Sequence, residues 1–150
     1  MGIKIVTENR KARFDYSILE TFEAGMVLRG SEVKSLRNGG CQLKDSYVVF
    51  QNTELYLQNA HISIYTASAH HNHAPERKRK LLMHRKEIER LASRVQEKGL
   101  SLIPLKVYFK EGKAKVEIAL AKGKKRFDKR ESIKSKDVAR ELNQQKRKIR

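Results

Sequence analysis

Residues 105–120 read LKVYFKEGKAKVEIAL, and this stretch decides the fold class. Apolar residues alternate with polar ones on both sides of Glu111-Gly112. Such alternation is typical of half-buried strands, and a Gly-containing pair between two of them favours a tight turn. The alternating apolar residues are Leu105, Val107 and Phe109 before the turn and Ala114, Val116, Ile118 and Leu120 after it. The stretch therefore predicts an antiparallel hairpin.

Three further strands are predicted on the N-terminal side of this hairpin. Between Phe14 and Val27 apolar residues recur at intervals of two, and Glu20 interrupts them, which indicates a strand with a bend. Residues 43–50 and 55–60 form two more apolar runs on either side of the polar segment 51–54. A second hairpin is therefore expected there.

Two helices are predicted between the strands. Ser31 can cap a helix that starts near Gly30, Glu32 suits its positive end, and the segment 38–40 would stop it. In residues 84–98 apolar side chains fall on one helical face, and Gly99 supplies the stop. At least five strands with two inserted helices predict a small closed or partly closed barrel of OB-like kind, a shape that often binds oligonucleotides.

The composition divides the chain near residue 122. Residues 122–150 hold 13 Lys and Arg, 4 Asp and Glu, and only six apolar residues, too few to form a core. We therefore expect two units, a barrel at 1–121 and a basic tail at 122–150.

The charge of the chain predicts a polyanionic partner. Its 34 Lys and Arg exceed its 17 Asp and Glu, which gives a net charge of +17. Nucleic acid is the expected partner, and an anionic membrane surface is the weaker alternative. No run of about 18 apolar residues is present to span a bilayer and no apolar signal segment is seen, so a cytoplasmic protein is expected. Cys41 is the single cysteine, which excludes an internal disulfide and a Cys-based zinc site.

No pattern in the sequence indicates an enzyme or a cofactor. No Ser lies in a nucleophile elbow, and no Gly-rich phosphate loop follows a strand. His70, His71 and His73 lie close together, but a polar loop is favoured over a metal site there. The segment 77–80, which reads RKRK, favours phosphate contact, with a solvated turn before a buried strand as the alternative. Four aromatic residues are interpreted as packing rather than base-stacking groups: Tyr56, Tyr65, Tyr108 and Phe109.

Seven short blocks of sequence stand out in order along residues 9–130. They are NRKAR at 9–13, FEAG at 22–25, GSEVKSLR at 30–37, KDSY at 44–47, NAHI at 59–62, RKLL at 79–82, and AKGKK at 121–125 with DKR at 128–130. Together they resemble the bacterial tmRNA-binding family called small protein B or SsrA-binding protein. The resemblance implies a mainly β protein with an OB-like six-stranded antiparallel barrel, about three helices, and a basic C-terminal tail that is disordered when free.

The resemblance also implies a role in trans-translation and two sets of binding residues. The barrel would bind the tRNA-like domain of tmRNA through Asn9, Lys11, Arg13, Glu23, Lys34, Arg37, Arg79, Lys80, Leu82 and His84. The tail would become helical in the empty message channel of a stalled ribosome, near the decoding centre. Its contacts there would be Gly123, Lys124, Lys125, Phe127, Asp128, Lys129 and Arg130, with Gly123 as the joint between barrel and tail.

Two of these positions and the choice of partner leave alternatives open. His84 stands where the family can hold Asn. Because a carboxylate repels phosphate, Glu23 would accept hydrogen bonds from a base edge or 2′-hydroxyl of RNA, orient a neighbouring Arg, or form an internal salt bridge. The partners implied by the resemblance are tmRNA, the ribosome with its small-subunit RNA, and elongation factor Tu with GTP in the delivery complex. The rivals are a generic oligonucleotide-binding module and a membrane-surface protein, and the few aliphatic residues of the tail argue against the membrane.

Overall fold

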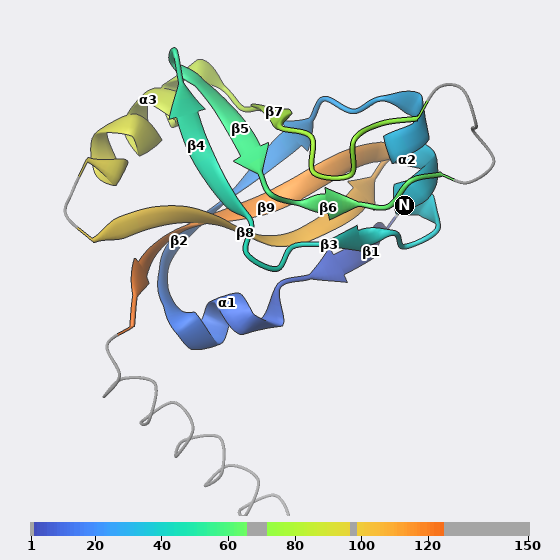
Figure 1. Cartoon of the computed structure of the whole chain (residues 1–150). Coiled ribbons are helices and arrows are strands. Elements are labelled where there is room, and N and C mark those ends of the chain that lie inside the picture. The colour runs from blue at the N-terminus through green and yellow to red at the C-terminus, as the bar shows by residue number, and fades with distance from the viewer. Residues whose placement is uncertain (1, 66–71, 97–98, 125–150) are drawn as a thin grey trace, which may run out of the picture.

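The computed structural model describes residues 2–65, 72–96 and 99–124 of the chain. This part contains nine strands and three helices, drawn in Figure 1. The strands are β1 (Ile3–Glu8), β2 (Tyr16–Met26), β3 (Cys41–Gln42), β4 (Tyr47–Gln51), β5 (Glu54–Gln58), β6 (His61–Ile62), β7 (Arg79–Leu82), β8 (Leu100–Lys110) and β9 (Lys113–Gly123). The helices are α1 (Arg10–Asp15), α2 (Gly30–Arg37) and α3 (Arg85–Val95).

Six of these strands close into an antiparallel barrel. In the order β8, β4, β5, β7, β2 and β9 each strand pairs with the next, and β9 pairs back with β8. The strand β8 is long enough to pair with β4 at Leu102 and with β1 over residues 106–110, while its opposite edge pairs with β9. A separate two-stranded sheet joins β3 to β6. The predicted OB-like, six-stranded antiparallel barrel is confirmed.

The hairpin read from residues 105–120 is also confirmed, and it buries both of its faces. The register of β8 on β9 shifts between Pro104 and Lys106, so the simple alternation is broken at Leu105. Val107 and Phe109 pack in the barrel core, whereas Leu105 packs in a second apolar cluster outside it. The other buried members of this second cluster are Ala12, Ile103, Ala119 and Ala121. Helix α1, which contributes Ala12, therefore covers part of the outer surface of the hairpin.

The region before residue 20 differs from the sequence prediction. Phe14 lies in α1, and β2 begins only at Tyr16, whereas the alternation of apolar residues predicts a strand from Phe14. A helix of six residues is too short to show a 3.6-residue pattern. Its start is instead fixed by tertiary contact, because the backbone N–H of Asn9 donates to the carbonyl of Leu105 at 2.7 Å. The bend predicted at Glu20 is confirmed as a register shift between Ile18 and Glu20.

Both predicted helices and the hairpin predicted at residues 43–60 are confirmed with shorter bounds. The first turn of α2 is held by Glu32, whose carboxylate accepts the backbone N–H of Arg29 at 2.8 Å, so the predicted cap at Ser31 is wrong. His84 is the N-cap residue of α3, and Gly99 after it has a φ of +84°. The first strand of the 43–60 hairpin begins only at Tyr47. No helix in the described ranges is long and apolar enough to cross a membrane.

Candidate nucleic-acid interface

Helix α1 carries three cations, Arg10, Lys11 and Arg13, and none of the three forms an ion pair with another described residue. Lys11 and Arg13 are exposed, while Ala12 between them is buried against the barrel. Within residues 2–65, 72–96 and 99–124 neither side chain forms an ion pair. Both are therefore available to phosphate oxygens.

The cations of α3 have a different environment. Arg90 lies 2.9 Å from Glu20 of β2, and Arg85 lies 3.3 Å from Glu89 one turn later. These pairs neutralise part of the positive charge before any ligand arrives. Of the two helices, α1 is thus the stronger candidate for an RNA contact.

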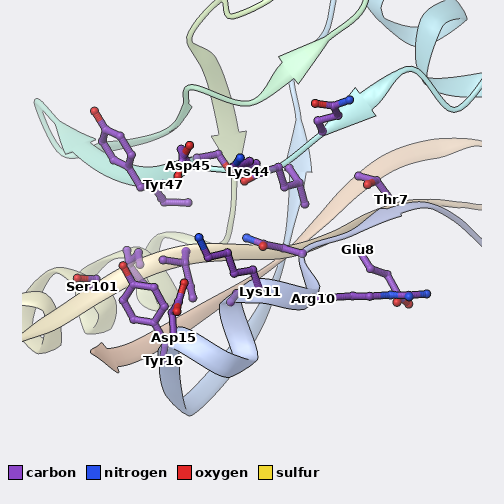
Figure 2. A pocket seen from close by; sticks show the side chains of 18 of the residues that line it. Thr7, Glu8, Arg10, Lys11, Asp15, Tyr16, Lys44, Asp45, Tyr47 and Ser101 are labelled. Carbon is purple, nitrogen blue, oxygen red and sulfur yellow. Dashed lines mark hydrogen bonds between the residues drawn. The ribbon is translucent and has the colours of Figure 1, made fainter. Parts of the chain in front are cut away.

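A pocket of about 840 Å³ opens beside α1. It lies between α1, residues 42–48 and the start of β8, and Figure 2 shows Lys11 on one wall with Lys44 and Asp45 opposite. Asn9 also lines the pocket, and its side-chain amide donates to the carbonyl of Pro104 at 3.0 Å. Its lining combines three cations, three carboxylates and two tyrosines: Arg10, Lys11 and Lys44; Glu8, Asp15 and Asp45; Tyr16 and Tyr47. Such a mixture offers partners for the phosphates, polar edges and faces of nucleotides.

The C-terminal end of the barrel lies against the same helix. Gly123 pairs with Tyr16 at the start of β2, and the backbone N–H of Lys124 donates to the carbonyl of Asp15 at 2.9 Å. Gly123, the residue predicted as the joint between barrel and tail, is therefore paired in the last strand of the barrel. The other predicted ribosome contacts, Lys125, Phe127, Asp128, Lys129 and Arg130, lie outside the described residues.

Glu23 and Leu82 form a second group of predicted residues. Gly25 of β2 pairs with Leu82 of β7, whose side chain is 53 % exposed. A groove of about 390 Å³ beside Leu82 is lined by Phe109, Lys113 and Lys115, among other residues. On β2, Glu23 lies seven positions after Tyr16 of the α1 pocket, a span of about 23 Å at ~3.3 Å per residue. The second group is therefore a distinct place on the barrel.

Glu23 has internal partners, as expected for an internal salt bridge, and an exposed carboxylate, as expected for a residue that accepts hydrogen bonds from RNA. Its Oε2 accepts a hydrogen bond from the hydroxyl of Tyr108 and lies 3.6 Å from Nζ of Lys110. The hydrogen bond from Tyr108, with the positive charges of Lys110 and Lys115, lowers the pKa of the Glu23 carboxyl although burial opposes this shift. Its side chain is still 39 % exposed, so an ionised carboxylate remains accessible to a ligand.

Three other predicted cations lie on α2 and β7. Lys34 and Arg37 are exposed on α2, and Nζ of Lys34 lies 5.6 Å from the ring centre of Tyr65. Lys80 is partly exposed, and its Nζ lies 3.0 Å from Oε1 of Glu54. His84 is exposed at the N-terminus of α3.

Arg79 is a correction to the prediction, because its side chain is fully buried. Its Nε lies 2.6 Å from Oε2 of Glu32, and its other nitrogens donate to the carbonyls of Ala60 at 2.6 Å and Pro75 at 2.9 Å. Arg77 binds the second oxygen of Glu32 at 2.5 Å. An arginine with all of these partners inside the fold is not available to RNA, and for Arg79 the predicted contact is wrong. Its partner Glu32 is 47 residues away in sequence, so the local RKRK pattern gave no sign of the pairing.

Two further titratable candidates, His73 and Cys41, are buried. His73 is buried, with Nδ1 2.9 Å from the hydroxyl of Ser31 and Nε2 2.9 Å from the carbonyl of Ile62. His70 and His71 lie outside the described residues, and the described ones contain no cluster of three or more potential metal ligands. Burial raises the pKa of the Cys41 thiol to about 11, which keeps it uncharged.

Sequence reasoning missed two features of the interface. Tyr108 was interpreted only as a packing residue; the ring is indeed 3 % exposed, but its hydroxyl binds Glu23 from across the sheet. Lys44, Asp45 and Tyr47 were not assigned a role, although they form a wall of the α1 pocket. The only sign of this role in the sequence is that Tyr108, which carries a hydroxyl, alternates with the core residues Val107 and Phe109 in β8.

Comparisons with known proteins place the chain in a family. A family model described as SmpB protein matches residues 6–148. The chain belongs to the SmpB family. This agrees with the resemblance seen in the seven sequence blocks.

Curated relatives carry the name SsrA-binding protein. The protein of Bdellovibrio bacteriovorus is 61 % identical over 94 % of this chain and 93 % of its own length, and that of Pelotomaculum thermopropionicum is 59 % identical over 95 % and 94 %. A solved chain from a study of tmRNA–SmpB at the centre of the bacterial ribosome is 50 % identical. It covers 85 % of this chain and 93 % of its own length, with a TM-score of 0.68. The SmpB-family fold thus extends through the described barrel.

Proposed function

We propose that this protein binds the tRNA-like domain of tmRNA and delivers alanyl-tmRNA to stalled ribosomes in trans-translation. The observation that carries the proposal is its membership of the SmpB family over nearly the whole chain, including relatives named for SsrA binding. The exposed cations Lys11, which lines the α1 pocket, and Arg13 on the same helix supply a physical basis for binding RNA. The family is one of RNA-binding proteins, so the role is that of an adaptor and not of an enzyme.

The barrel and the tail have separate tasks in this proposal. Asn9, Lys11, Arg13, Glu23 and Leu82 lie on the barrel and would contact tmRNA. The tail, residues 125–150, would occupy the vacant message channel, where its basic side chains neutralise ribosomal RNA phosphates. Phe127 would stack on a base near the decoding centre. Delivery would occur in the cytoplasm together with elongation factor Tu and GTP.

Substrate preference tests the proposal against a generic oligonucleotide-binding module. The full chain is titrated with a transcript of the tRNA-like domain and with an unstructured RNA of equal length, at the same salt concentrations. We expect tighter binding to the tRNA-like transcript, and a loss of affinity on changing Lys11 and Arg13 to Gln. Arg90→Gln is the matched control, because Arg90 is paired with Glu20. Equal affinity for the two RNAs would instead favour the generic module.

Truncation tests the division of labour. A chain ending at Lys124 keeps β9 and its contacts with α1. It should bind the tRNA-like transcript nearly as well as the full chain, but fail to support peptidyl transfer to tmRNA on ribosomes with an empty message channel. Loss of both activities would contradict the assignment of tmRNA binding to the barrel.

A further inference from the structure

Two clusters on the outside of the barrel are built from the same three residue types. The Glu23 cluster consists of Glu23, Tyr108 and Lys110, and the Glu54 cluster consists of Glu54, Tyr56 and Lys80. In each, a tyrosine hydroxyl donates to the glutamate and a lysine ammonium lies nearby. The two clusters thus offer an internal comparison of what such an arrangement does.

The clusters differ in how the carboxylate oxygens are used. In the Glu54 cluster the hydroxyl of Tyr56 binds Oε2 at 2.7 Å and Lys80 binds Oε1 at 3.0 Å, so both oxygens are occupied. In the Glu23 cluster Tyr108 and Lys110 both approach Oε2. Within the described part of the chain, no hydrogen bond or ion pair reaches Oε1 of Glu23.

We propose that Tyr108 is a positioning residue for RNA recognition: its hydroxyl fixes Oε2 of Glu23 so that Oε1 accepts a hydrogen bond from a nucleobase amino group or a ribose 2′-hydroxyl. This inference rests on the proposed function. It assigns to Tyr108 a role exerted through Glu23 and not through contact with RNA, since the Tyr108 side chain is buried in the sheet.

The lysines around Glu23 explain why its Oε1 would bind nucleobase amino groups and 2′-hydroxyls in particular. Lys110 and Lys115 lie close enough to affect the carboxylate, and Lys113 lines the adjacent groove. Ammonium groups attract the RNA backbone without regard to sequence, whereas an ionised carboxylate repels phosphate and accepts only from donors. Nucleobase amino groups and 2′-hydroxyls are the donors that RNA offers. A fixed acceptor among lysines therefore adds selectivity to a surface that otherwise attracts any polyanion.

The burial of the tyrosine ring makes its hydroxyl a rigid anchor. The Tyr108 side chain is 3 % exposed, and its backbone pairs with Ile5 of β1 and Lys115 of β9. A glutamate without this anchor would sample several rotamers and would have to be ordered when RNA binds. Ordering a flexible side chain costs about 0.5–1.5 kcal/mol, which corresponds to about a 2- to 12-fold loss of affinity.

A double-mutant cycle on the full chain tests the inference. Dissociation constants for the tRNA-like transcript are measured for the unaltered chain, Tyr108→Phe, Glu23→Ala and the variant with both changes. Tyr108→Phe should weaken binding by about 2- to 12-fold when Glu23 is present, and should have no effect when Glu23 is Ala. Tyr56→Phe is the matched control, since it removes the equivalent hydroxyl from a cluster whose carboxylate is already filled, and should bind like the unaltered chain.

The salt dependence separates positioning from a general disturbance of the lysine-rich surface. Removing the Tyr108 hydroxyl, which donates to Glu23, leaves the number of neutralised phosphates and thus the slope of log affinity against log salt unchanged. Removing a cation that pairs with a phosphate reduces the slope by about 0.7–0.9. An effect of Tyr108→Phe that persists in the Glu23→Ala background, or that comes with a reduced slope, would show a structural role and overturn the inference. So would unchanged binding by Tyr108→Phe in a chain that prefers the tRNA-like transcript. If the unaltered chain shows no such preference, the proposed function itself fails.

Discussion

Glu32 and Glu23 are both carboxylates held by side chains from distant parts of the sequence, yet their environments differ in almost every respect. Glu32 is 0 % exposed, and its two oxygens are bound by Arg77 and Arg79. Glu23 is 39 % exposed, and its internal partners approach one oxygen only. We therefore interpret Glu32 as a part of the fold and Glu23 as a part of the binding surface. An acid in a basic protein can have either role, and burial together with the number of free oxygens distinguishes them.

The largest expected effect is that of removing the buried carboxylate. Glu32→Ala leaves Arg79 buried without its counter-ion and opens the contact between α2 and β7. Removing one partner of a buried ion pair costs about 3–5 kcal/mol, so the free energy of unfolding should fall by about that amount. Urea denaturation measures it, with Glu23→Ala as the matched control on the surface. A Glu32→Ala variant no less stable than Glu23→Ala would refute the comparison.

Arg79 provides the reciprocal test. In the Glu32→Ala background, Arg79→Met removes the uncompensated charge and replaces it with an apolar side chain of similar length. Because replacing both partners of a buried pair is far less costly than removing one, the double variant should regain much of the lost stability. A double variant less stable than Glu32→Ala alone would show that the hydrogen bonds of Arg79 to the carbonyls of Ala60 and Pro75 matter more than its charge.

The acid dependence of stability is the next effect in size. Burial by itself raises the pKa of Glu32, but the hydrogen bonds from Arg77, the backbone of Arg29 and Arg79 outweigh it and the pKa lies below its ordinary value of 4.5. As pH falls, the Glu32 carboxyl therefore becomes protonated in the unfolded chain before it does so in the folded protein. Its contribution to the free energy of unfolding is fully present above about pH 4.5 and is lost as pH falls through the lowered pKa of the folded state. Stability should thus fall between neutral pH and about pH 4 by more in the parent than in Glu32→Gln. Denaturation midpoints at the two pH values provide the measurement, and equal losses would contradict it.

The sequence predicted the parts of the fold that depend on long local patterns. The hairpin of β8 and β9 alternates over many residues, and α3 has a continuous apolar face. Helix α1 was not predicted because its six residues are held by contacts with β8 and not by a periodic pattern. The break at Leu105 was missed for the same reason, since a bulge depends on the pairing of two strands.

The site was predicted less completely than the fold, and the reason is again the range of the interactions. The family-like blocks identified exposed residues such as Lys11, Arg13 and Leu82, whose surroundings are consistent with a surface role. The same blocks placed Arg79 at the RNA surface, and the basic run RKRK in a positively charged chain favoured the same interpretation. Only the three-dimensional structure reveals that Glu32 lies beneath it, and only the structure brings Tyr108 to Glu23, 85 residues away.

Neutralising the exposed residues Lys11 and Arg13 is expected to change stability little and to weaken RNA binding clearly. Changing Lys11 and Arg13 to Gln removes from α1 two exposed charges that have no ion-pair partner among the described residues, and leaves its buried residue, Ala12, unaltered. The free energy of unfolding should change by no more than about 0.5 kcal/mol. Affinity for the tRNA-like transcript should fall, and the slope against log salt should decrease by about 0.7–0.9 for each phosphate that the variant no longer neutralises. A large loss of stability with an unchanged slope would place these residues in the same structural role as Glu32.

The smallest effect, on stability and on RNA binding alike, is expected from changing Arg90. This residue is exposed like Lys11 and paired with an acid like Arg79. Its guanidinium lies 2.9 Å from Glu20, and its side chain is 61 % exposed. Arg94 also lies 3.7 Å from Glu20, so the carboxylate keeps one cation when Arg90 is changed to Gln. Exposed pairs are worth about 0.2–1 kcal/mol, and with Arg94 still present the loss should lie at the lower end of that range. The salt slope for RNA binding should not change, because the charge of Arg90 is already matched by an acid. A slope reduced as much as by a change at Lys11 would show that RNA also contacts α3 and that an internal ion pair does not keep a cation from the ligand.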